Sequence, residues 1–293
     1  MSVDVEEHFQ VQAFAKLVPR ESWPLHPSRV EQNTRLLLDL FDESGTKATF
    51  FTLGCVAREH PSLVREIVVR GHEMASHGMD HRMLTELTPD EFRIQARDSR
   101  ALLEDLTGKR VLGFRAPSYS IGRSTLWAID LLAETGYEYD SSVYPIRRRR
   151  YGYPEGPVAP AMIRGPGGAS LAEFPLPTLA VGPLRIPVLA GAFLRLLPLH
   201  LSRLALELHR SGARALIVNV HPWELDPTQP TLGPSRRATW THYARLGRVE
   251  GILRALLSRA TFRTAATRLG QLGLLPGSRG LNEIPSADVK SGD

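Results

Sequence analysis

The segment Ser76-His77-Gly78-Met79-Asp80-His81 places two imidazoles four residues apart. Side chains at positions i and i+4 share one face of a helical turn, so both rings could reach a single metal ion. The metalloprotease motif His-Glu-x-x-His has the same spacing, but the interior here is Gly-Met-Asp, so that activity is not indicated. Because two surface histidines would explain such a pair equally well, its meaning depends on the rest of the chain.

Short apolar runs and amphipathic segments alternate on both sides of this segment. The apolar runs predict buried strands at residues 1–3, 47–53, 72–76, 111–115, 137–140, 171–174, 184–188 and 215–220. Helices are predicted at about 28–44, 56–70, 88–106, 124–135, 195–211 and 243–258. This alternation indicates βα units with a parallel sheet. The predicted fold is therefore α/β, an irregular (β/α) barrel of about seven strands rather than a doubly wound sheet.

Local signals predict where two of these helices begin. Ser28 and Glu31 form a capping-box pattern before the helix that Gly45 would end. Thr88-Pro89-Asp90-Glu91 combines an N-cap residue, a proline at the first helical position and a capping glutamate. Both helices are therefore predicted to begin at a side-chain cap.

Composition limits the class of protein. The 293 residues are 42% hydrophobic and 23% charged, which is ordinary for a globular protein. The sequence contains no apolar run of about 18 residues, and acidic residues near the N-terminus replace the basic start of a signal peptide. The one cysteine, Cys55, excludes an intramolecular disulfide and fits a reducing compartment. A cytoplasmic protein is expected, with the inner membrane face as an alternative location.

The positive charge is concentrated in one run. Lys and Arg number 36 and Asp and Glu 31, which gives a net charge of +5, and four arginines stand together at Arg147–Arg150. A solvated loop is the main interpretation of this run, and contact with an anionic polymer or a membrane surface is the alternative. No nucleic-acid-binding motif accompanies it, so nucleic acid is not an expected partner.

Polar residues stand at the predicted carboxyl ends of several strands: Asp4, His77, Arg115, Asp140 and His221. In parallel α/β folds this edge of the sheet is where ligands bind. A metal-dependent hydrolase needs imidazole and carboxylate ligands together with a base and an acid. The two histidines can bind the metal, while Asp4 and Glu6 supply two carboxylates, one for the metal and one for a base. Arg115 could keep that base ionised, and His221 could protonate a departing amine.

Five motifs resemble those of the polysaccharide deacetylases of the NodB-homology class (carbohydrate esterase family four), in particular the subfamily of bacterial exopolysaccharide and PEP-CTERM-associated loci. They are Asp4-Val5-Glu6-Glu7-His8-Phe9, Ser76-His77-Gly78-Met79-Asp80-His81, Arg115-Ala116-Pro117-Ser118-Tyr119-Ser120, Tyr139-Asp140-Ser141-Ser142 and His221-Pro222-Trp223-Glu224-Leu225-Asp226. The resemblance implies one deacetylase-like barrel domain over residues 1–270, which includes the subfamily's C-terminal extension. Residues 271–293 are expected to form a disordered tail.

The resemblance also implies a role for each site residue. Asp4 would be the general base and Arg115 would hold it, while His221 would be the general acid and Asp140 would hold its charged form. The metal ligands would be Glu6, His77 and His81. Two positions depart from the family pattern. Val5 stands where the family has a second Asp, which Glu6 would replace, and Asn219 stands where a leucine usually lines the acetyl pocket.

The implied function is metal-dependent removal of acetyl groups from N-acetylhexosamine units of a bacterial polysaccharide. The cofactor would be one divalent ion, with zinc expected and cobalt, nickel or iron as alternatives, because two His and a carboxylate suit all of them. The partner would be an N-acetylated polysaccharide or oligosaccharide. Two alternatives remain open: a related hydrolase of a cyclic amide, and a catalytically silent glycan-binding protein.

Overall fold

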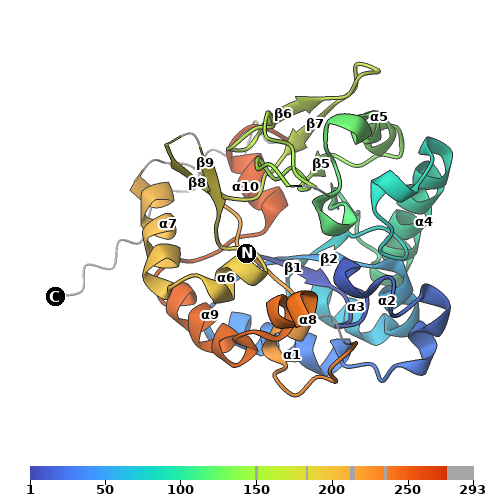
Figure 1. Ribbon diagram of the computed structural model, residues 1–293. Helices are drawn as coiled ribbons and strands as arrows, with labels where there is room; N and C mark the ends of the chain where they lie inside the picture. The colour runs from blue at the N-terminus through green and yellow to red at the C-terminus, as the bar shows by residue number, and fades with distance from the viewer. Residues whose placement is uncertain (149–150, 183, 212–214, 234–235, 276–293) are drawn as a thin grey trace.

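Parallel strands form a curled sheet at the centre of the protein (Figure 1). The computed structural model describes residues 1–148, 151–182, 184–211, 215–233 and 236–275. The strand order is β10-β1-β2-β3-β4-β5-β7-β6, and every described pairing in it is parallel except that between β6 and β7. The predicted irregular (β/α) barrel with about seven parallel strands is confirmed, in the form of a half-barrel.

The strands are short, and most are buried. Their bounds are β1 Ser2–Val5, β2 Thr49–Thr52, β3 Glu73–Ser76, β4 Gly113–Phe114, β5 Tyr139–Asp140, β6 Ala161–Arg164, β7 Ser170–Glu173 and β10 Asn219–Val220. The first strand lies inside the sheet, because β1 pairs with β10 on one side and β2 on the other. A separate antiparallel hairpin consists of β8 Thr178–Val181 and β9 Leu184–Pro187. The strand predicted at 184–188 therefore lies outside the central sheet.

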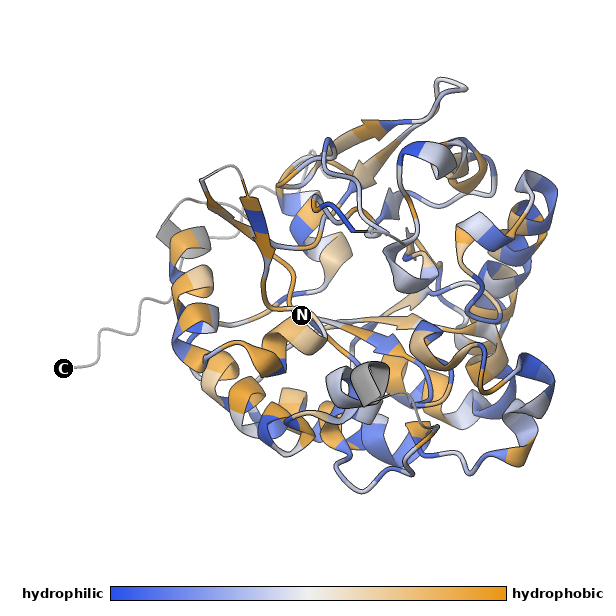
Figure 2. Ribbon diagram, viewed as in Figure 1, coloured by the Kyte–Doolittle hydropathy of each residue, from blue (hydrophilic) through white to orange (hydrophobic). Residues whose placement is uncertain are grey.

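Helices lie around the outside of the sheet (Figure 1). Their bounds are α1 Val30–Glu43, α2 Gly54–Glu59, α3 Pro61–Val69, α4 Pro89–Thr107, α5 Trp127–Glu134, α6 Ala192–Leu196, α7 Leu199–Ser211, α8 Arg236–Tyr243, α9 Val249–Leu257 and α10 Ala265–Gln271. Figure 2 colours the hydrophobic segments of these helices orange, and in α1, for example, Leu37, Leu38 and Phe41 are buried. Among the described residues, no helix is both long and apolar enough to cross a membrane.

Three of the predicted helices are divided in the structure. The helix predicted at 56–70 is split into α2 and α3, because Pro61 begins a new helix and cannot continue the previous one. The helix predicted at 195–211 is interrupted in the same way before α7, where Pro198 stands. The one predicted at 243–258 is replaced by α8 and α9 with a 3-10 turn between them. Of the predicted tail, 276–293 lies outside the described residues, and α10 ends at Gln271.

The two helix starts predicted from capping patterns have different outcomes. At α4 the capping box is present, because the Thr88 hydroxyl accepts from the Glu91 amide and the Glu91 carboxylate accepts from the Thr88 amide. At α1, Ser28 does not cap the helix. Instead, the Glu7 carboxylate accepts hydrogen bonds from the first amides of α1, and Ser28 donates to that carboxylate. A residue distant in sequence therefore replaces the local cap.

Candidate active site and metal centre

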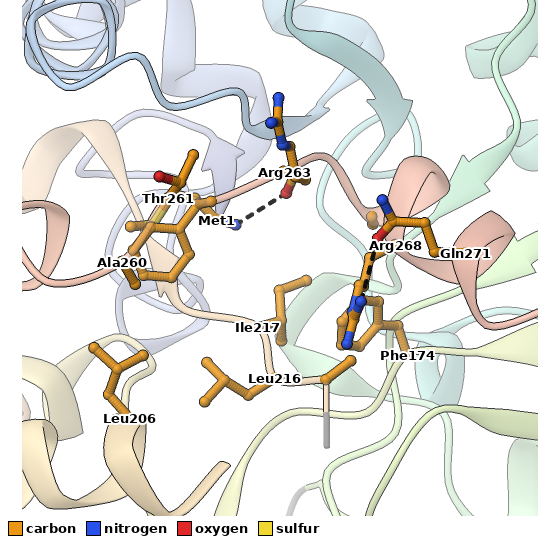
Figure 3. A pocket seen from close by; sticks show the side chains of 13 residues that line it. Met1, Phe174, Leu206, Leu216, Ile217, Ala260, Thr261, Arg263, Arg268 and Gln271 are labelled. Atoms are coloured by element: carbon orange, nitrogen blue, oxygen red, sulfur yellow. Dashed lines mark hydrogen bonds between the residues drawn. The ribbon is translucent and has the colours of Figure 1, made fainter. Parts of the chain in front are cut away.

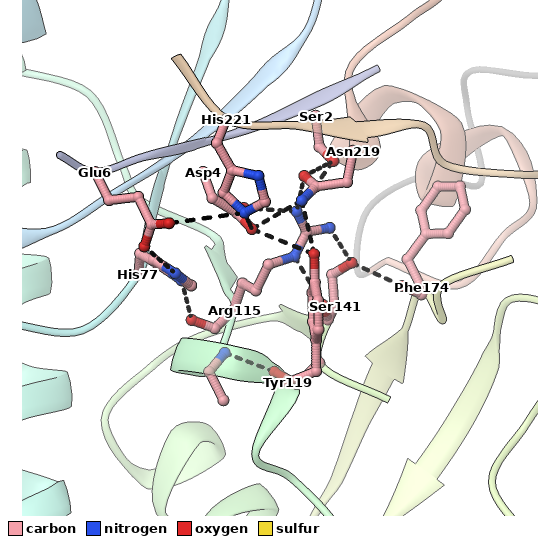
Figure 4. A network of polar contacts seen from close by, with 12 residues as sticks. Ser2, Asp4, Glu6, His77, Arg115, Tyr119, Ser141, Phe174, Asn219 and His221 are labelled. Atoms are coloured by element: carbon pink, nitrogen blue, oxygen red, sulfur yellow. Dashed lines mark hydrogen bonds and ion pairs between the residues drawn. The ribbon is translucent and has the colours of Figure 1, made fainter. Parts of the chain in front are cut away.

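Polar side chains gather where the parallel strands end (Figure 4). Asp4 is near the end of β1 and Glu6 directly follows it, His77 follows β3, Arg115 follows β4 and His221 follows β10. Because neighbouring parallel strands end at the same edge of the sheet, residues far apart in the sequence meet here. The predicted clustering at strand ends is present for these residues.

Glu6, His77 and His81 form a compact group of possible metal ligands. His81 Nε2 lies 2.8 Å from Glu6 Oε2, and His77 Nε2 lies 4.0 Å from the same oxygen. One ligand atom from each residue lies within 4.8 Å of the other two, and all three side chains are buried. Trp223 donates to the other carboxylate oxygen of Glu6, Oε1, which leaves Oε2 facing the imidazoles.

The two histidines come together in a loop, which differs from the predicted helical turn. Residues 77–83 contain no helix, and Gly78 and His81 both have left-handed backbone conformations, with φ of 77° and 57°. The carbonyls of Gly78 and Met79 accept from the first two amides of α2, at 2.9 Å each. The loop is thus tied to the start of α2, and its bends, rather than helical spacing, bring the rings together.

The donor set fits a divalent cation. His77 Nδ1 is 2.8 Å from the Arg115 carbonyl oxygen, and this contact orients the ring so that Nε2 faces Glu6. Burial raises the pKa of Glu6, but His81, together with His221 and His77, lowers it to about 2. Burial lowers the pKa of His77 to about 4. At neutral pH the site therefore has an ionised carboxylate and a neutral imidazole, the forms in which these groups bind metal.

Asp4 lies next to this group and is held as a carboxylate. Arg115 Nη1 donates to Asp4 Oδ1 at 2.7 Å, and His221 Nε2 lies 3.6 Å from Asp4 Oδ2. Burial raises the pKa of Asp4, but the charges of Arg115, His77 and His221 outweigh burial and lower it to about 2. Asp4 is therefore ionised at neutral pH and can accept a proton.

Arg115 is fully buried, and its guanidinium is bonded on every side. It donates to Ser2, Asn219 and both the carbonyl and hydroxyl oxygens of Ser141, at 2.6 to 3.0 Å. One face lies over the Phe51 ring, with the guanidinium carbon 4.0 Å from the ring centre. A planar cation with this many partners has one orientation, so it positions the Asp4 carboxylate firmly.

Asn219 belongs to the Asp4 network rather than to an acetyl pocket. Its amide nitrogen donates to Asp4 Oδ2 at 2.9 Å and to the Tyr119 hydroxyl at 2.7 Å. The side chain is fully buried, and it does not line the cavity that holds Asp4, Glu6, His77 and His81. The Asn219 found where the family usually has leucine therefore supplies an additional donor to the carboxylate of Asp4.

His221 is held by Glu224, which the sequence analysis did not single out. His221 Nδ1 lies 2.9 Å from Glu224 Oε2, and the other oxygen of Glu224 accepts from the buried Arg195 at 2.8 Å. Burial lowers the pKa of His221, but the hydrogen bond and charge of Glu224, with the charges of Glu6 and Asp4, raise it to about 9. His221 is therefore protonated at neutral pH, with Nε2 toward Asp4.

A local signal could have identified Glu224. In His-Pro-Trp-Glu the proline stands at the first position of a 3-10 turn and the glutamate at the third. A glutamate at that position reaches back to the cap residue, as in a capping box. Here the cap residue is His221, and Glu224 accepts from its backbone amide at 3.0 Å as well as contacting its ring.

The prediction that Asp140 pairs with His221 is wrong. Both Asp140 oxygens accept from Ser142, one from the hydroxyl at 2.6 Å and one from the amide at 3.1 Å. Asp140 is opposite Glu173 of β7 in the strand register. Burial and the Asp140 carboxylate raise the pKa of Glu173 well above its usual range, so Glu173 rather than His221 is the titratable neighbour of Asp140. The physical reason is position, because four strands separate β5 from β10 in the sheet.

The site residues line one cavity of about 230 Å³, here called the catalytic pocket. Its walls include Asp4, Glu6, His77, His81 and His221. Arg115 and Asp140 do not line it, and Arg115 reaches it through its hydrogen bond to Asp4. The candidate metal ligands, the candidate base and the candidate acid therefore all face the same cavity.

A different pocket of about 260 Å³ lies at the opposite ends of the strands (Figure 3). It is lined by Met1 before β1 and by residues 215–217 before β10, with apolar side chains such as Phe174 and Leu206. Its polar lining includes Arg268, which donates to Gln271 at 3.2 Å. Among the described residues no acid or histidine lines it, so this part of the chain offers it no groups for acid–base or metal chemistry.

Residues 24–139 match the model of the polysaccharide deacetylase family, and residues 141–269 match a domain of unknown function, DUF3473. Residues 24–139 are therefore a polysaccharide deacetylase domain, as the motifs predict. Asp4 and Glu6 precede the first match, and His221 lies in the second. In the sheet, β7 of the second match lies beside β5. β10 of the second match lies beside β1, which precedes the first match and pairs with its β2, so both matches contribute to one sheet.

Curated relatives are similar over part of their length. A peptidoglycan deacetylase-like protein from Gibberella zeae is 38% identical over 109 residues, which cover 36% of this chain and 31% of the relative. A chitooligosaccharide deacetylase from Azorhizobium caulinodans is 33% identical over 93 residues, which cover 31% of this chain and 42% of the relative. The peptidoglycan deacetylase of Helicobacter pylori is 32% identical over 107 residues, with 36% of each covered. The chain therefore matches well under half of each of these relatives.

Solved structures share the fold across nearly the whole chain. A putative polysaccharide deacetylase from Mycobacterium smegmatis has a TM-score of 0.60 at 20% identity, covering 100% of this chain and 93% of that one. PuuE allantoinase has a TM-score of 0.58 at 18% identity, and the match covers 92% of this chain and 89% of that one. At such low identity the likeness establishes the fold alone, which is that of the NodB-like deacetylases.

Proposed function

We propose that this protein is a metal-dependent N-deacetylase that removes acetyl groups from N-acetylhexosamine units of a bacterial polysaccharide and releases acetate. The observation that carries the proposal is the content of the catalytic pocket. Three candidate metal ligands, a carboxylate base and a protonated histidine all line the same cavity of about 230 Å³. Hydrolysis of an amide needs these groups together, because the carbonyl must be attacked and the amine must leave protonated.

Glu6, His77 and His81 would hold the divalent cation, with Trp223 and the Arg115 carbonyl orienting two of these ligands. The cation would supply Lewis acidity, which polarises a carbonyl and makes a water molecule more acidic. Asp4 accepts a proton from the attacking water. Because Arg115 keeps the pKa of Asp4 low, the base is available at neutral pH.

His221 acts when the amine leaves. As the water oxygen bonds to the carbonyl carbon and the carbon–nitrogen bond breaks, His221 Nε2 gives its proton to the departing nitrogen. Glu224 stabilises the charged imidazole that can do this. The products are acetate and a hexosamine with a free amine. Zinc is the proposed ion, and cobalt, nickel and iron suit the same ligands.

The test is acetate release from N-acetylglucosamine oligomers by purified protein in three forms: chelated, chelated and reloaded with zinc, and Asp4→Asn reloaded with zinc. Release that requires the metal and falls by at least about a hundredfold in the variant supports the reaction and the base together. The metal content of each form is measured alongside. No release from protein that binds one metal per chain would contradict the proposal and favour another amide, such as a cyclic one. No release and no metal would favour a silent glycan-binding protein.

A further inference from the structure

A second cavity of about 410 Å³ adjoins the catalytic pocket. The two share wall residues, among them Tyr119, Tyr151, His221 and Trp223, so they lie side by side. The second cavity extends past these residues to Tyr144 and Phe193, and we call it the aromatic pocket. An acetyl group is small, so the catalytic pocket has room for it. The aromatic pocket therefore provides space for a further part of the substrate.

The walls of the aromatic pocket suit the face of a sugar ring. Tyr144 and Tyr151 are stacked with their ring centres 6.3 Å apart, and Tyr151 and Phe193 are partly exposed. Aromatic faces bind the apolar face of a flat ligand while solvent or polar groups reach its edge. The Tyr144 hydroxyl is buried and forms no hydrogen bond in the described part of the chain. A cavity of this size can hold at least one hexose beside the reacting one.

A free positive charge lies at the edge of this cavity. The Arg148 guanidinium carbon is 5.6 Å from the ring centre of Phe193, and its charge acts on both Tyr144 and Tyr151. Arg148 is exposed, and it forms no ion pair with any carboxylate of the described residues. By contrast, the exposed Arg123 near the same segment pairs with Glu155 at 2.7 Å. Arg148 is therefore placed to bind an anionic group from outside the protein.

We propose that the aromatic pocket binds a sugar that carries an anionic group, next to the N-acetylhexosamine whose amide lies in the catalytic pocket, and that Arg148 recognises that group. The shared chemistry is a carboxylate, as in a hexuronic acid, or a phosphate. The inference rests on the proposed deacetylase function and narrows its substrate to acidic polysaccharides. It also assigns a role to part of the Arg147–Arg150 run, of which residues 149–150 lie outside the described structure.

The experiment compares matched substrates with the metal-loaded protein. One is an oligosaccharide of alternating glucuronic acid and N-acetylglucosamine, and the other is the same oligosaccharide after its carboxylates are reduced to alcohols. We expect kcat/KM to be about threefold to fivefold higher for the acidic form, the effect of one charge-assisted contact at an exposed site. The preference should shrink as salt concentration rises. Arg148→Gln should remove the preference and leave the reduced substrate within about twofold of its original rate.

Arg147→Gln is the matched control, because it removes the same charge one residue away, near Glu155 rather than the aromatic rings. Equal rates on the two substrates, or equal losses in both variants, would overturn the inference while leaving the deacetylase proposal intact. Failure to deacetylate any oligosaccharide would instead count against the proposed function. Saturation-transfer NMR of the same oligosaccharides then tests the pocket without turnover: binding that weakens in Arg148→Gln alone supports it, and absence of binding overturns it. Competition by glucuronate or by glucose 6-phosphate distinguishes a carboxylate from a phosphate.

Discussion

The imidazole of His221 is bonded to Glu224, three residues further along the chain, at 2.9 Å. The acid that the family resemblance assigns to this contact, Asp140, instead lies opposite Glu173 in the strand register and accepts from Ser142. The carboxylate that stabilises the proposed general acid therefore comes from a neighbouring position in the sequence. It lies within one 3-10 turn after β10, and Arg195 anchors it from the other side.

The first prediction distinguishes the contribution of Glu224 to catalysis from that of Asp140. Glu224→Gln should lower kcat by about ten- to a hundredfold, because the neutral amide no longer stabilises protonated His221. Asp140→Asn should lower it by less than about threefold, because Asp140 does not touch the reacting groups. Steady-state kinetics on one N-acetylated oligosaccharide measures both. Thermal unfolding is the control, since Glu224→Gln also leaves Arg195 without its carboxylate. An equal loss in both variants would contradict this assignment.

The second prediction concerns pH. The pKa of His221 is raised to about 9, so its protonated form is present at neutral pH and is lost as pH rises through that value. Deacetylation should therefore fall on the alkaline side of about pH 9. In Glu224→Gln the fall should begin at least about one pH unit lower, because the partner that raises the pKa has lost its charge. A pH profile of kcat measures this shift, and an unchanged alkaline limb in the variant would exclude His221 as the titrating acid.

The third prediction concerns the metal centre. His77→Ala, His81→Ala and Glu6→Ala should each reduce bound metal by about tenfold or more at limiting metal concentration. Asp4→Asn should retain about one metal per chain, because Asp4 is outside the ligand group. Elemental analysis of dialysed protein gives the stoichiometry. Metal loss in Asp4→Asn, with circular dichroism unchanged, would mean that Asp4 is a ligand rather than the base.

The fourth prediction tests the loop that presents the histidines. A Cβ added at Gly54 would overlap the sulfur of Met79, which lies between His77 and His81. Gly54→Ala should therefore displace the flexible Met79 side chain, lower the free energy of unfolding by less than about 1 kcal/mol and weaken metal binding. Gly251→Ala is the matched control: it lies exposed in α9, and its Cβ meets nothing within 4 Å. It should raise stability by about 0.5–1 kcal/mol and leave metal binding unchanged. Chemical denaturation with and without zinc measures both effects.

Much of the fold was predictable because its signals are local. The apolar runs that become β2 and β3, and the capping box of α4, depend on neighbours in sequence. The ends of parallel strands must lie at one edge of a sheet, so Asp4, His77 and His221 could be expected to meet. Proline breaks such as Pro61 were also visible but were outweighed by the apolar periodicity on either side.

Other features depended on contacts between distant segments. Glu7 replaces Ser28 as the cap of α1 because β1 places its carboxylate at the start of that helix. Asn219 joins the Asp4 network because β10 pairs beside β1. Neither contact leaves a periodic pattern, since each joins segments more than twenty residues apart in the sequence.

The sequence alone determined which residue types could perform the chemistry and which strands would carry them. This was possible because strands and helices are indicated by the periodicity of apolar residues over a few neighbouring positions. The tertiary structure decided which carboxylate each histidine meets. Asp140 is opposite Glu173 in the strand register, whereas Glu224 turns back onto His221. In a buried site a charged ring needs a partner within hydrogen-bond distance, and only packing determines which of several acids is that close.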